Sequence, residues 1–374
     1  MKIKTITCHD VYNHGASLQA YALQTYLESQ GHDVEIIDYK PPYLSGHYNL
    51  WAVNNPIYDK PFIKQAYLVA KLPGRLIALK RKRAFDRFTS KHLKLTKRYY
   101  SYQELEVCPP EADVFIAGSD QIWNTLFSNG RDKAFYLAFV PAGSVRISYA
   151  ASFATPNIVE EYKPFVIEML KRIDRISIRE TSSLPLLSNL GRPDGIAVCD
   201  PVFLLTKEQW EFLIPKNASN EKQYLLVYDT EGSERIKDIA KKISEKRHLS
   251  ILNVSAFRLK YADKNFHDAG PIGFLQLLHN ASYIVSNSFH ATAFSIIFQK
   301  DFCVVNRSEN INERMQSLLS DFRLSNRFVS EFHNGILSPI NYNSIYTLLS
   351  EHINKSKHFI NEAIDPNLLS VDTY

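Results

Sequence analysis

The chain has 374 residues, is 45% hydrophobic and carries a formal net charge of +5, which describes a globular protein with room for two ordinary domains. This composition excludes disordered and fibrous proteins, because neither class carries enough apolar residues to close a core. The four cysteines stand far apart without CxxC or CxxH spacing, so we predict no disulfide framework, no zinc site and no other bound metal.

The cellular compartment follows from the same features. The N-terminal stretch MKIKTITCHDVYNHG lacks the apolar core of a secretory signal, and no apolar run approaches the roughly 20 residues of a membrane span. We expect a cytoplasmic protein that is either soluble or peripheral at the inner face of the membrane.

The first forty residues predict a βαβ unit. Residues 2–7 and 33–39 have strand patterns, and between them SLQAYALQTYLESQ repeats apolar positions at helical spacing, with Gly31 as its C-cap. The turn CHDVYNHGA then lies at the carboxyl edge of a parallel sheet, where such folds bind ligands. It lacks GxGxxG, so the dinucleotide fingerprint is absent.

Basic residues are concentrated between positions 60 and 98, where thirteen Lys or Arg accompany one acid, Asp86. The centre of this segment, AYLVAKLPGRLIALKRKRAF, interleaves apolar side chains with the charges, as does a helix on an anionic membrane. We predict a basic helical insertion at about 58–98, with peripheral membrane contact through 60–98. A solvated helix face beside a core stripe is the simpler explanation and stays open. Nucleic-acid binding is not predicted, because no stacking motif or helix-turn-helix pattern accompanies the charge.

Beyond this segment, short apolar strands alternate with helices in two series. The first runs from DVFIAG through RISYAAS and RISIRE to GIAVCDPVFLL and completes one doubly wound sheet; the second runs from QYLLVY to DFCVVN. The predicted fold class is α/β, with two Rossmann-like domains facing across a cleft. We expect an N-terminal domain at 1–205, a C-terminal domain at 206–340, and a helix with a tail packing back at 341–374.

Four polar clusters follow apolar strands in this scheme, and strand ends bring distant parts of a chain to one cleft. The clusters are Asn13 with Gly15, Ser119 and Asp120 with Trp123, Arg179 with Glu180, and Ser288 with His290.

Each cluster also has a purely structural explanation. Ser288 and Asp120 are suited to capping the helices that follow them, and His290 alone is more often a packed histidine than a catalyst. Arg179 is suited to a structural ion pair, and Asp200 with its following proline predicts a turn.

Seven segments in order nevertheless resemble the polysaccharide pyruvyl transferase family, from near the N-terminus to about residue 305. They are NHGASLQAYALQTYL, VEIIDY, FIAGSDQIWN, SYAASF, SIRETSS, CDPVFLL and SNSFHATAFSIIF. The resemblance implies a GT-B-like arrangement and transfer of pyruvate from phosphoenolpyruvate to two hydroxyls of a sugar. The product is a cyclic ketal on a cell-surface glycan or its lipid-linked precursor. Phosphoenolpyruvate is then a substrate, and no cofactor is expected.

The resemblance also implies roles for individual residues. Arg179 and His290 correspond to donor-binding and catalytic positions, the C-terminal domain being the donor side and the N-terminal domain the acceptor side. An arginine fork and a helix N-terminus both suit the anionic groups of the donor, so Ser288 joins them. Arg307, like Arg314, is a further candidate phosphate contact, although a structural role explains either equally well. For the acceptor we expect Asp120 as base or hydroxyl-orienting group, with contacts from Asn13, Gly15, Ser119 and Trp123.

Two other functions suit the same pattern. A GT-B glycosyltransferase with a nucleotide-sugar donor would also need two α/β domains, because fold does not decide function. A non-catalytic glycan-binding or scaffold protein is the third hypothesis, and the presence of Arg179, Ser288 and His290 together disfavours it.

Overall fold

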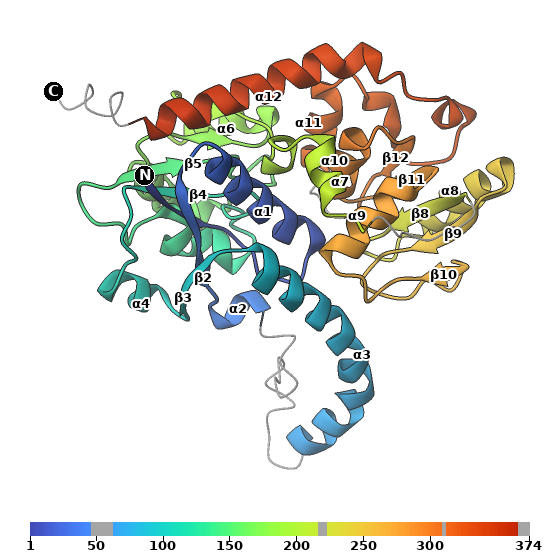
Figure 1. Cartoon of the computed structure of the whole chain (residues 1–374), viewed down its shortest axis with the longest axis horizontal. Helices are drawn as coiled ribbons and strands as arrows, with labels where there is room; N and C mark the ends of the chain where they lie inside the picture. Colours follow the sequence, from blue (N-terminus) through green and yellow to red (C-terminus); the bar gives the residue numbers. More distant parts are fainter. Residues whose placement is uncertain (46–62, 216–222, 309–311, 366–374) are drawn as a thin grey trace.

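The computed structural model describes residues 1–45, 63–215, 223–308 and 312–365. Two larger parallel sheets stand side by side in this part of the chain, one in each half (Figure 1). The predicted α/β class with two Rossmann-like domains is confirmed. The helix after the first strand, α1 (His14–Ser29), lies between the two halves and begins beside the second one.

The sheet of the first half has the order β3-β2-β1-β4-β5, and every neighbouring pair is parallel. Its strands are β1 (Lys2–Ile6), β2 (Asp33–Tyr39), β3 (Leu95–Tyr99), β4 (Val114–Ala117) and β5 (Val145–Ser148). Because β1 and β4 are adjacent but not consecutive, the winding reverses between them. The loops that leave their carboxyl ends therefore border a crevice, which is where open parallel sheets bind ligands.

The second sheet is also parallel, in the order β10-β9-β8-β11-β12-β13, and its winding reverses between β8 and β11. Its strands are β8 (Tyr224–Tyr228), β9 (Ser250–Asn253), β10 (Lys264–Asn265), β11 (Tyr283–Ser286), β12 (Phe302–Val305) and β13 (Phe328–Val329). The helices of this half are α8 (Glu234–Arg247), α9 (Pro271–Asn280), α10 (Phe289–Ile297) and α11 (Glu313–Asp321).

The first sheet is shorter than predicted. The segments RISIRE and GIAVCDPVFLL contain β6 (Ser177–Ile178) and β7 (Ile196–Ala197), which form a separate two-stranded sheet. Single bridges, such as Ala151 to Ile178, connect it to the loop after β5. The backbone there takes positive φ at Ala150 (52°) and Ala154 (60°), so the extended ladder cannot continue past Ser148. The helices around this sheet are α5 (Lys163–Leu170), α6 (Leu184–Asn189) and α7 (Lys207–Phe212).

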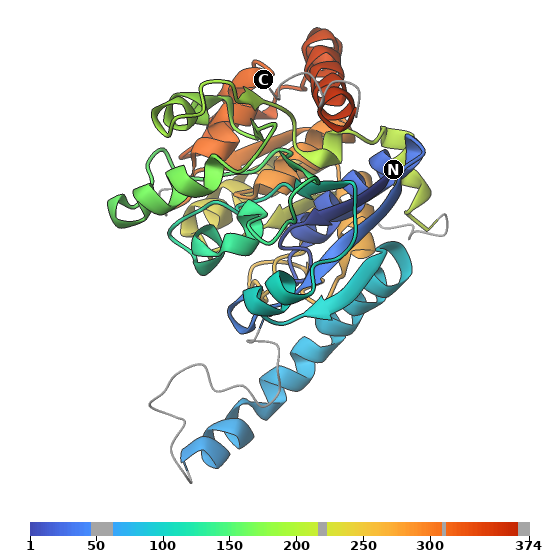
Figure 2. The same ribbon diagram turned by 90° about the vertical axis from the view of Figure 1, so that its left-hand side faces the viewer.

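The basic segment differs from the prediction at its C-terminal end. A single helix, α3 (Ile63–His92), is followed by an edge strand, β3, so the residues up to 98 are not all helical. The first half of α3 projects away from the body of the protein, whereas its second half packs against it (Figure 2). Phe85 and Phe88 are buried in that packed half. Two short helices, α2 (Pro42–Ser45) and α4 (Tyr102–Val107), lie near the same edge of the sheet.

Apolar packing joins the two halves. Tyr21 of α1 lies 5.8 Å, centroid to centroid, from Trp210, and Trp210 lies 4.9 Å from Phe294 of α10. His14, at the start of α1, stacks on Phe274 of α9 at 4.4 Å. The C-terminal helix α12 (Asn343–Ile364) crosses from the second half back to the first (Figure 1). A hydrophobic seam of this kind holds the two sheet edges in a defined relation.

Candidate active site

The site lies where the winding reversals of the two sheets meet. The loops after β1 and β4 carry Asn13 and Asp120, and the loop after β11 carries Ser288 and His290. Helices α1 and α10 are in contact and begin at these loops, so residues far apart in the sequence are brought together. The structure thus assembles most of the predicted residues around one cluster of charged side chains.

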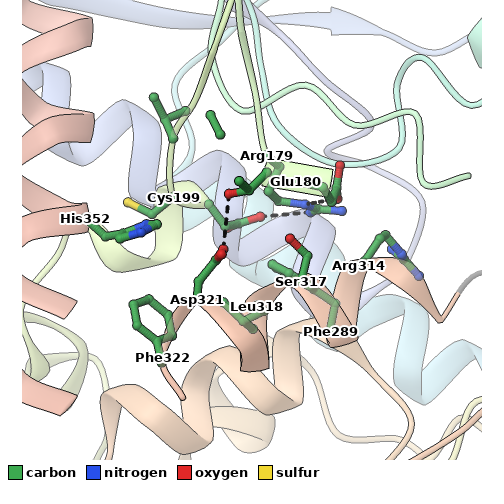
Figure 3. A pocket seen from close by; sticks show the side chains of 14 residues that line it. Arg179, Glu180, Cys199, Phe289, Arg314, Ser317, Leu318, Asp321, Phe322 and His352 are labelled. Atoms are coloured by element: carbon green, nitrogen blue, oxygen red, sulfur yellow. Dashed lines mark hydrogen bonds and ion pairs between the residues drawn. The ribbon is translucent and has the colours of Figure 1, made fainter. Parts of the chain in front are cut away.

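Arg179 is at the centre of this cluster and is buried (Figure 3). Its Nε donates to Glu180 Oε1 and its Nη1 to Asp200 Oδ2, both at 2.9 Å, and Nη1 lies 3.9 Å from Asp120 Oδ1. Burial by itself lowers the pKa of this guanidinium, but the three surrounding carboxylates outweigh burial and raise it. The guanidinium also lies over the ring of Phe289, 4.1 Å from its centroid. Two of its edges are therefore used structurally.

The remaining nitrogen of the Arg179 guanidinium, Nη2, is not used in this way. Among the described residues no group accepts a hydrogen bond from its buried Nη2. A buried N–H donor without a partner costs free energy, and an anionic ligand is the group that would relieve that cost. The structural ion pair and the ligand-binding role, which are alternatives from sequence alone, are thus compatible in one side chain.

The carboxylate of Asp200 lies against both Arg179 and His290. Its Oδ2 accepts from Arg179 and, at 3.0 Å, from Ser119 Oγ, and it lies 3.5 Å from Nε2 of His290. Burial alone raises the pKa of this carboxyl, but the neighbouring His290 and Arg179 side chains hold it below its ordinary value. Asp200 does form the predicted turn, since its Oδ1 accepts from the amide of Val202, but the turn is only half of its role.

His290 is buried against the first half of the protein. A Cβ atom on Gly15 would stand only 2.0 Å from Nδ1 of His290, so the imidazole occupies the space that the missing side chain leaves. One ring edge thus rests on α1 of the first half, and the opposite nitrogen, Nε2, faces Asp200. The imidazole is held between the two halves rather than displayed on either one.

Ser288 is at the N-cap position of α10, as the capping interpretation expects, yet its hydroxyl makes no capping hydrogen bond. Its carbonyl accepts from Thr292 Oγ1 at 2.9 Å, and its amide donates to Ser286 Oγ at 3.0 Å. The first N–H groups of α10 therefore receive no side-chain cap from Ser288, which is the condition for holding an anion at a helix N-terminus.

Two further arginines stand near Arg179. Arg314 of α11 is buried, and none of the described residues accepts from its Nε. Burial, together with the neighbouring Arg179 cation, lowers the pKa of Arg314 to about 10. Arg307, in the loop after β12, lies close enough to add to this effect, and its Nε is 3.5 Å from Glu231 Oε2. Cations that repel one another in a buried place indicate a site for an anion.

The space behind Arg179 and Arg314 is small. It is bordered by Phe289, by Asp321 of α11 and by His352 of α12, as Figure 3 shows, and its cavity volume is about 20 Å³. That is room for roughly one water molecule. The void supports the charged cluster from behind and is not itself a substrate pocket.

The residues predicted to bind the acceptor differ in how exposed their side chains are. Asp120 has φ of 75°, in the left-handed region, and its side chain is 16% exposed beside Arg179, as an orienting or basic group requires. Asn13 is exposed and caps α1, its Oδ1 accepting from the amides of Gly15 and Ala16. Ser119 is fully buried and serves to hold Asp200.

Trp123 does not fit the predicted contact with a sugar. Its side chain is fully buried, its Nε1 donates to the carbonyl of Phe135 at 3.0 Å, and its ring stacks on Tyr136. A short apolar turn follows the strand at this point, and the tryptophan turns inward to fill the core beneath it. Trp123 is therefore a core residue that supports the Asp120 loop from below.

Two Rossmann-like domains with a charged site at the meeting point of their sheet edges define the GT-B class. Within that class, the family model of polysaccharide pyruvyl transferases matches residues 13–309, and the chain belongs to this family. No characterised protein matched the chain in a comparison of full sequences.

Several solved structures share this architecture. A putative UDP-N-acetylglucosamine 2-epimerase from Listeria monocytogenes is 12% identical, with 100% of this chain and 98% of that one covered, at a TM-score of 0.54. The UDP-N-acetylglucosamine 2-epimerase from Rickettsia bellii is 12% identical, with 96% of this chain and 95% of that one covered, at a TM-score of 0.51. The UDP-GlcNAc 2-epimerase from Methanocaldococcus jannaschii, in complex with UDP-GlcNAc and UDP, is 13% identical, with 96% of this chain and 99% of that one covered, at a TM-score of 0.50. At such identities the likeness establishes the fold alone.

Sequence reasoning missed Asp200 and underrated Arg314. Both follow apolar segments that end at the site, and Asp200 lies in the segment CDPVFLL, which carries part of the family resemblance. The aspartate before a proline was accounted for by its turn, so nothing in the local pattern pointed to His290, ninety residues further on.

Proposed function

We propose that this protein transfers pyruvate from phosphoenolpyruvate to two hydroxyls of a sugar, forming a cyclic ketal on a surface glycan or its lipid-linked precursor. One observation carries the proposal: two buried guanidiniums, Arg179 and Arg314, lie near the imidazole of His290, and each has an N–H group for which the described part of the chain offers no acceptor. Membership of the pyruvyl transferase family supports it.

The donor carries a phosphate and a carboxylate, and the site offers groups suited to both. The open Nη2 of Arg179 and the Nε of Arg314 suit one anionic end. The N-terminus of α10 at Ser288 suits the other end, because its first-turn N–H groups receive no cap from the Ser288 side chain. Arg307 adds positive charge near Arg314.

Proton transfer is assigned to His290 and Asp120. The imidazolium of His290 gives a proton to the methylene carbon of phosphoenolpyruvate while a sugar hydroxyl attacks the neighbouring carbon and loses its own proton to Asp120. The second hydroxyl then displaces phosphate, which leaves with that hydroxyl's proton. The methylene has become a methyl group, two C–O bonds to the sugar have formed, and the C–O bond to phosphate has broken. His290 and Asp120 carry the first two proton transfers, the departing phosphate takes the third proton, and no cofactor is required.

A titration distinguishes this proposal from a nucleotide-sugar glycosyltransferase. Phosphoenolpyruvate should raise the melting temperature of the protein and of a Trp123→Phe control, whereas UDP- and GDP-sugars should leave it unchanged. The opposite pattern of stabilisation would reject the pyruvyl transferase assignment.

The reaction itself is tested with acceptors that end in galactose, mannose or N-acetylmannosamine, by mass and phosphate release. We expect one of them to gain a ketal and to release one phosphate per ketal. His290→Ala should abolish the product while leaving the acceptor's binding in place. Unchanged ketal formation by that variant would remove His290 from the mechanism.

We also propose that α3 brings the enzyme to an anionic membrane that carries lipid-linked acceptors. The projecting first half of α3 exposes Ile63, Val69 and Leu72, while Lys80 and Arg83 expose their charges nearer the body. Exposed apolar and basic side chains on one helix are typical of binding at a bilayer surface. None of the helices in the described ranges combines the length and apolarity that a membrane crossing demands.

Vesicle sedimentation tests this contact. The protein should bind vesicles with anionic lipid more strongly than neutral ones, and less strongly as salt rises. Replacing Lys80 and Arg83 by glutamine should weaken binding, whereas the same change at the exposed Lys241 and Lys242 of α8 should not. Arg81 is left intact because it is buried and donates to backbone carbonyls, Nη2 to that of Tyr12 at 3.2 Å. Equal binding to both kinds of vesicle would refute the proposal.

A further inference from the structure

An open pocket at the edge of the first sheet has no role in the reaction described above. Four tyrosines gather in it with polar side chains from the loop after β4, and its cavity volume is about 580 Å³, which is in the range of small-molecule sites. We call it the tyrosine pocket and define it by Tyr39, Tyr43, Tyr100, Tyr102, Arg131 and Asp132.

The tyrosine pocket is built rather than accidental. The hydroxyls of Tyr39 and Tyr43 both donate to Oδ2 of Asp132, at 2.6 and 2.5 Å. The other oxygen, Oδ1, accepts from the amide of Ala134 at 2.9 Å, which fixes the carboxylate in place. Two tyrosine rings are therefore held in set orientations before any ligand arrives, and this lowers the entropy that binding costs.

Its chemistry favours a carbohydrate. Tyr100 is 57% exposed and Tyr43 43% exposed, so apolar ring faces are offered to solvent inside a concave surface. A sugar presents C–H groups on one face and hydroxyls around its rim, and tyrosine combines an apolar ring with a polar tip. The surrounding charges are of both signs, with Arg131 and Lys133 beside Asp132, so a polyanion such as nucleic acid has no preference for this place.

The position of the pocket connects it to the site. Tyr39 ends β2, which pairs with β1, and β1 pairs with β4, whose end leads to Asp120. Two strand spacings amount to roughly 10 Å, a distance that a short oligosaccharide spans. The buried thiol of Cys8, two residues after β1, is near one residue of the site and one of the tyrosine pocket: burial raises its pKa, and the charges of Asp120 and Asp132 raise it further.

We infer that the tyrosine pocket binds sugar residues of the acceptor beyond the one that receives pyruvate. It selects an oligosaccharide over a free monosaccharide and sets the direction in which the glycan chain enters. This inference rests on the proposed function, which makes the glycan the acceptor. Binding of a sugar to the tyrosine pocket can nevertheless be measured without the reaction.

The experiment compares a monosaccharide with a trisaccharide that ends in the same sugar, for each of the galactose, mannose and N-acetylmannosamine series. For the wild-type protein we expect a lower KM for the trisaccharide. Tyr100→Ala should raise that KM roughly tenfold, in line with the loss of one aromatic contact, and leave kcat and the monosaccharide KM unchanged. Tyr100→Phe keeps the ring face and should behave as wild type, as should Tyr346→Ala, which removes an exposed tyrosine on α12.

Calorimetric titration of each trisaccharide without phosphoenolpyruvate tests the subsite separately from the proposed function. Trisaccharide binding that Tyr100→Ala weakens, in a protein that forms no ketal, would retain the subsite and reject the proposed function. Ketal formation on a monosaccharide, with no effect of Tyr100→Ala on any trisaccharide, would overturn the subsite alone. Failure of every trisaccharide to bind would overturn it as well.

Discussion

Replacement of Asp200 by asparagine tests the central interaction of the site. The carboxylate is fully buried, and a single oxygen, Oδ2, faces Arg179 Nη1 at 2.9 Å, Ser119 Oγ at 3.0 Å and His290 Nε2 at 3.5 Å. Asparagine has the same shape and keeps the oxygen that caps Val202. The substitution thus removes a negative charge while leaving the turn, and it places an N–H₂ group against the guanidinium of Arg179 and the imidazole of His290.

The expected cost has a structural and a catalytic part. Removing one partner from a buried charge cluster costs about 3 kcal/mol or somewhat more. In a chain of this size, with an unfolding entropy of roughly 2.1 cal/mol/K per residue, that corresponds to a melting temperature lower by roughly 4 °C. The imidazole of His290 also loses the carboxylate that faces Nε2 at 3.5 Å and orients the ring, so kcat should fall by roughly 10²- to 10³-fold. Binding of phosphoenolpyruvate should weaken much less, because Nη2 of Arg179 and Nε of Arg314 are not altered.

The pH dependence of stability is a second readout. Because the pKa of Asp200 is lower in the folded protein than its ordinary value of about 3.9, its ionisation stabilises the fold fully above that value. This contribution is lost as pH falls through the acid range toward the folded pKa. Asp200→Asn has no such group, so its unfolding free energy should decline less steeply below about pH 4 than that of the wild type.

Steady-state kinetics, chemical denaturation at several pH values and the pH–rate profile provide the measurements. The control is Asp194→Asn, which removes a carboxylate that also pairs with an arginine, Arg192 at 2.7 Å, but is 55% exposed. That variant should keep wild-type kcat and lose less than about 1 kcal/mol. Wild-type kcat in Asp200→Asn at a temperature where it remains folded would refute the assignment of Asp200 as the residue that positions His290.

Three other substitutions test the remaining parts of the site. Gly15→Ala places a methyl group against the imidazole of His290, so kcat should fall roughly 100-fold with a modest loss of stability. An unchanged kcat would show that the position of the imidazole against Gly15 is not needed for the reaction. Arg314→Gln removes a buried cation that Arg179 repels, so the protein without donor should melt at the same temperature or higher. Its affinity for phosphoenolpyruvate should fall at least tenfold. A lower melting temperature with unchanged donor affinity would show that Arg314 has a structural role. Trp123→Phe loses the hydrogen bond to a backbone carbonyl and part of a core ring, so unfolding should cost about 1–3 kcal/mol less, with the acceptor KM unchanged; a raised KM would restore Trp123 to the acceptor site.

The sequence by itself was sufficient for the plan of the fold. Strand and helical patterns predicted α1, β2 and β8 to within a few residues, because these elements bury apolar side chains in a regular pattern. Short elements were predicted less well. β3 follows a basic helix without a turn signal, and β6 with β7 leave the first sheet because positive φ values after β5 interrupt the ladder.

Residues whose chemistry suits an anion and whose position follows a strand were also identified from sequence. Arg179, Ser288 and His290 stand at strand ends, and parallel sheets gather such ends by construction. What only the tertiary structure decided is how each polar group is used. Asp200 joins His290 to Arg179 across a gap that no local pattern records, Trp123 turns into the core, and Gly15 is small because an imidazole from the other half of the chain lies against it. Local patterns report the face that a segment buries, whereas the partner of a buried charge is set by packing between segments that are far apart in the chain.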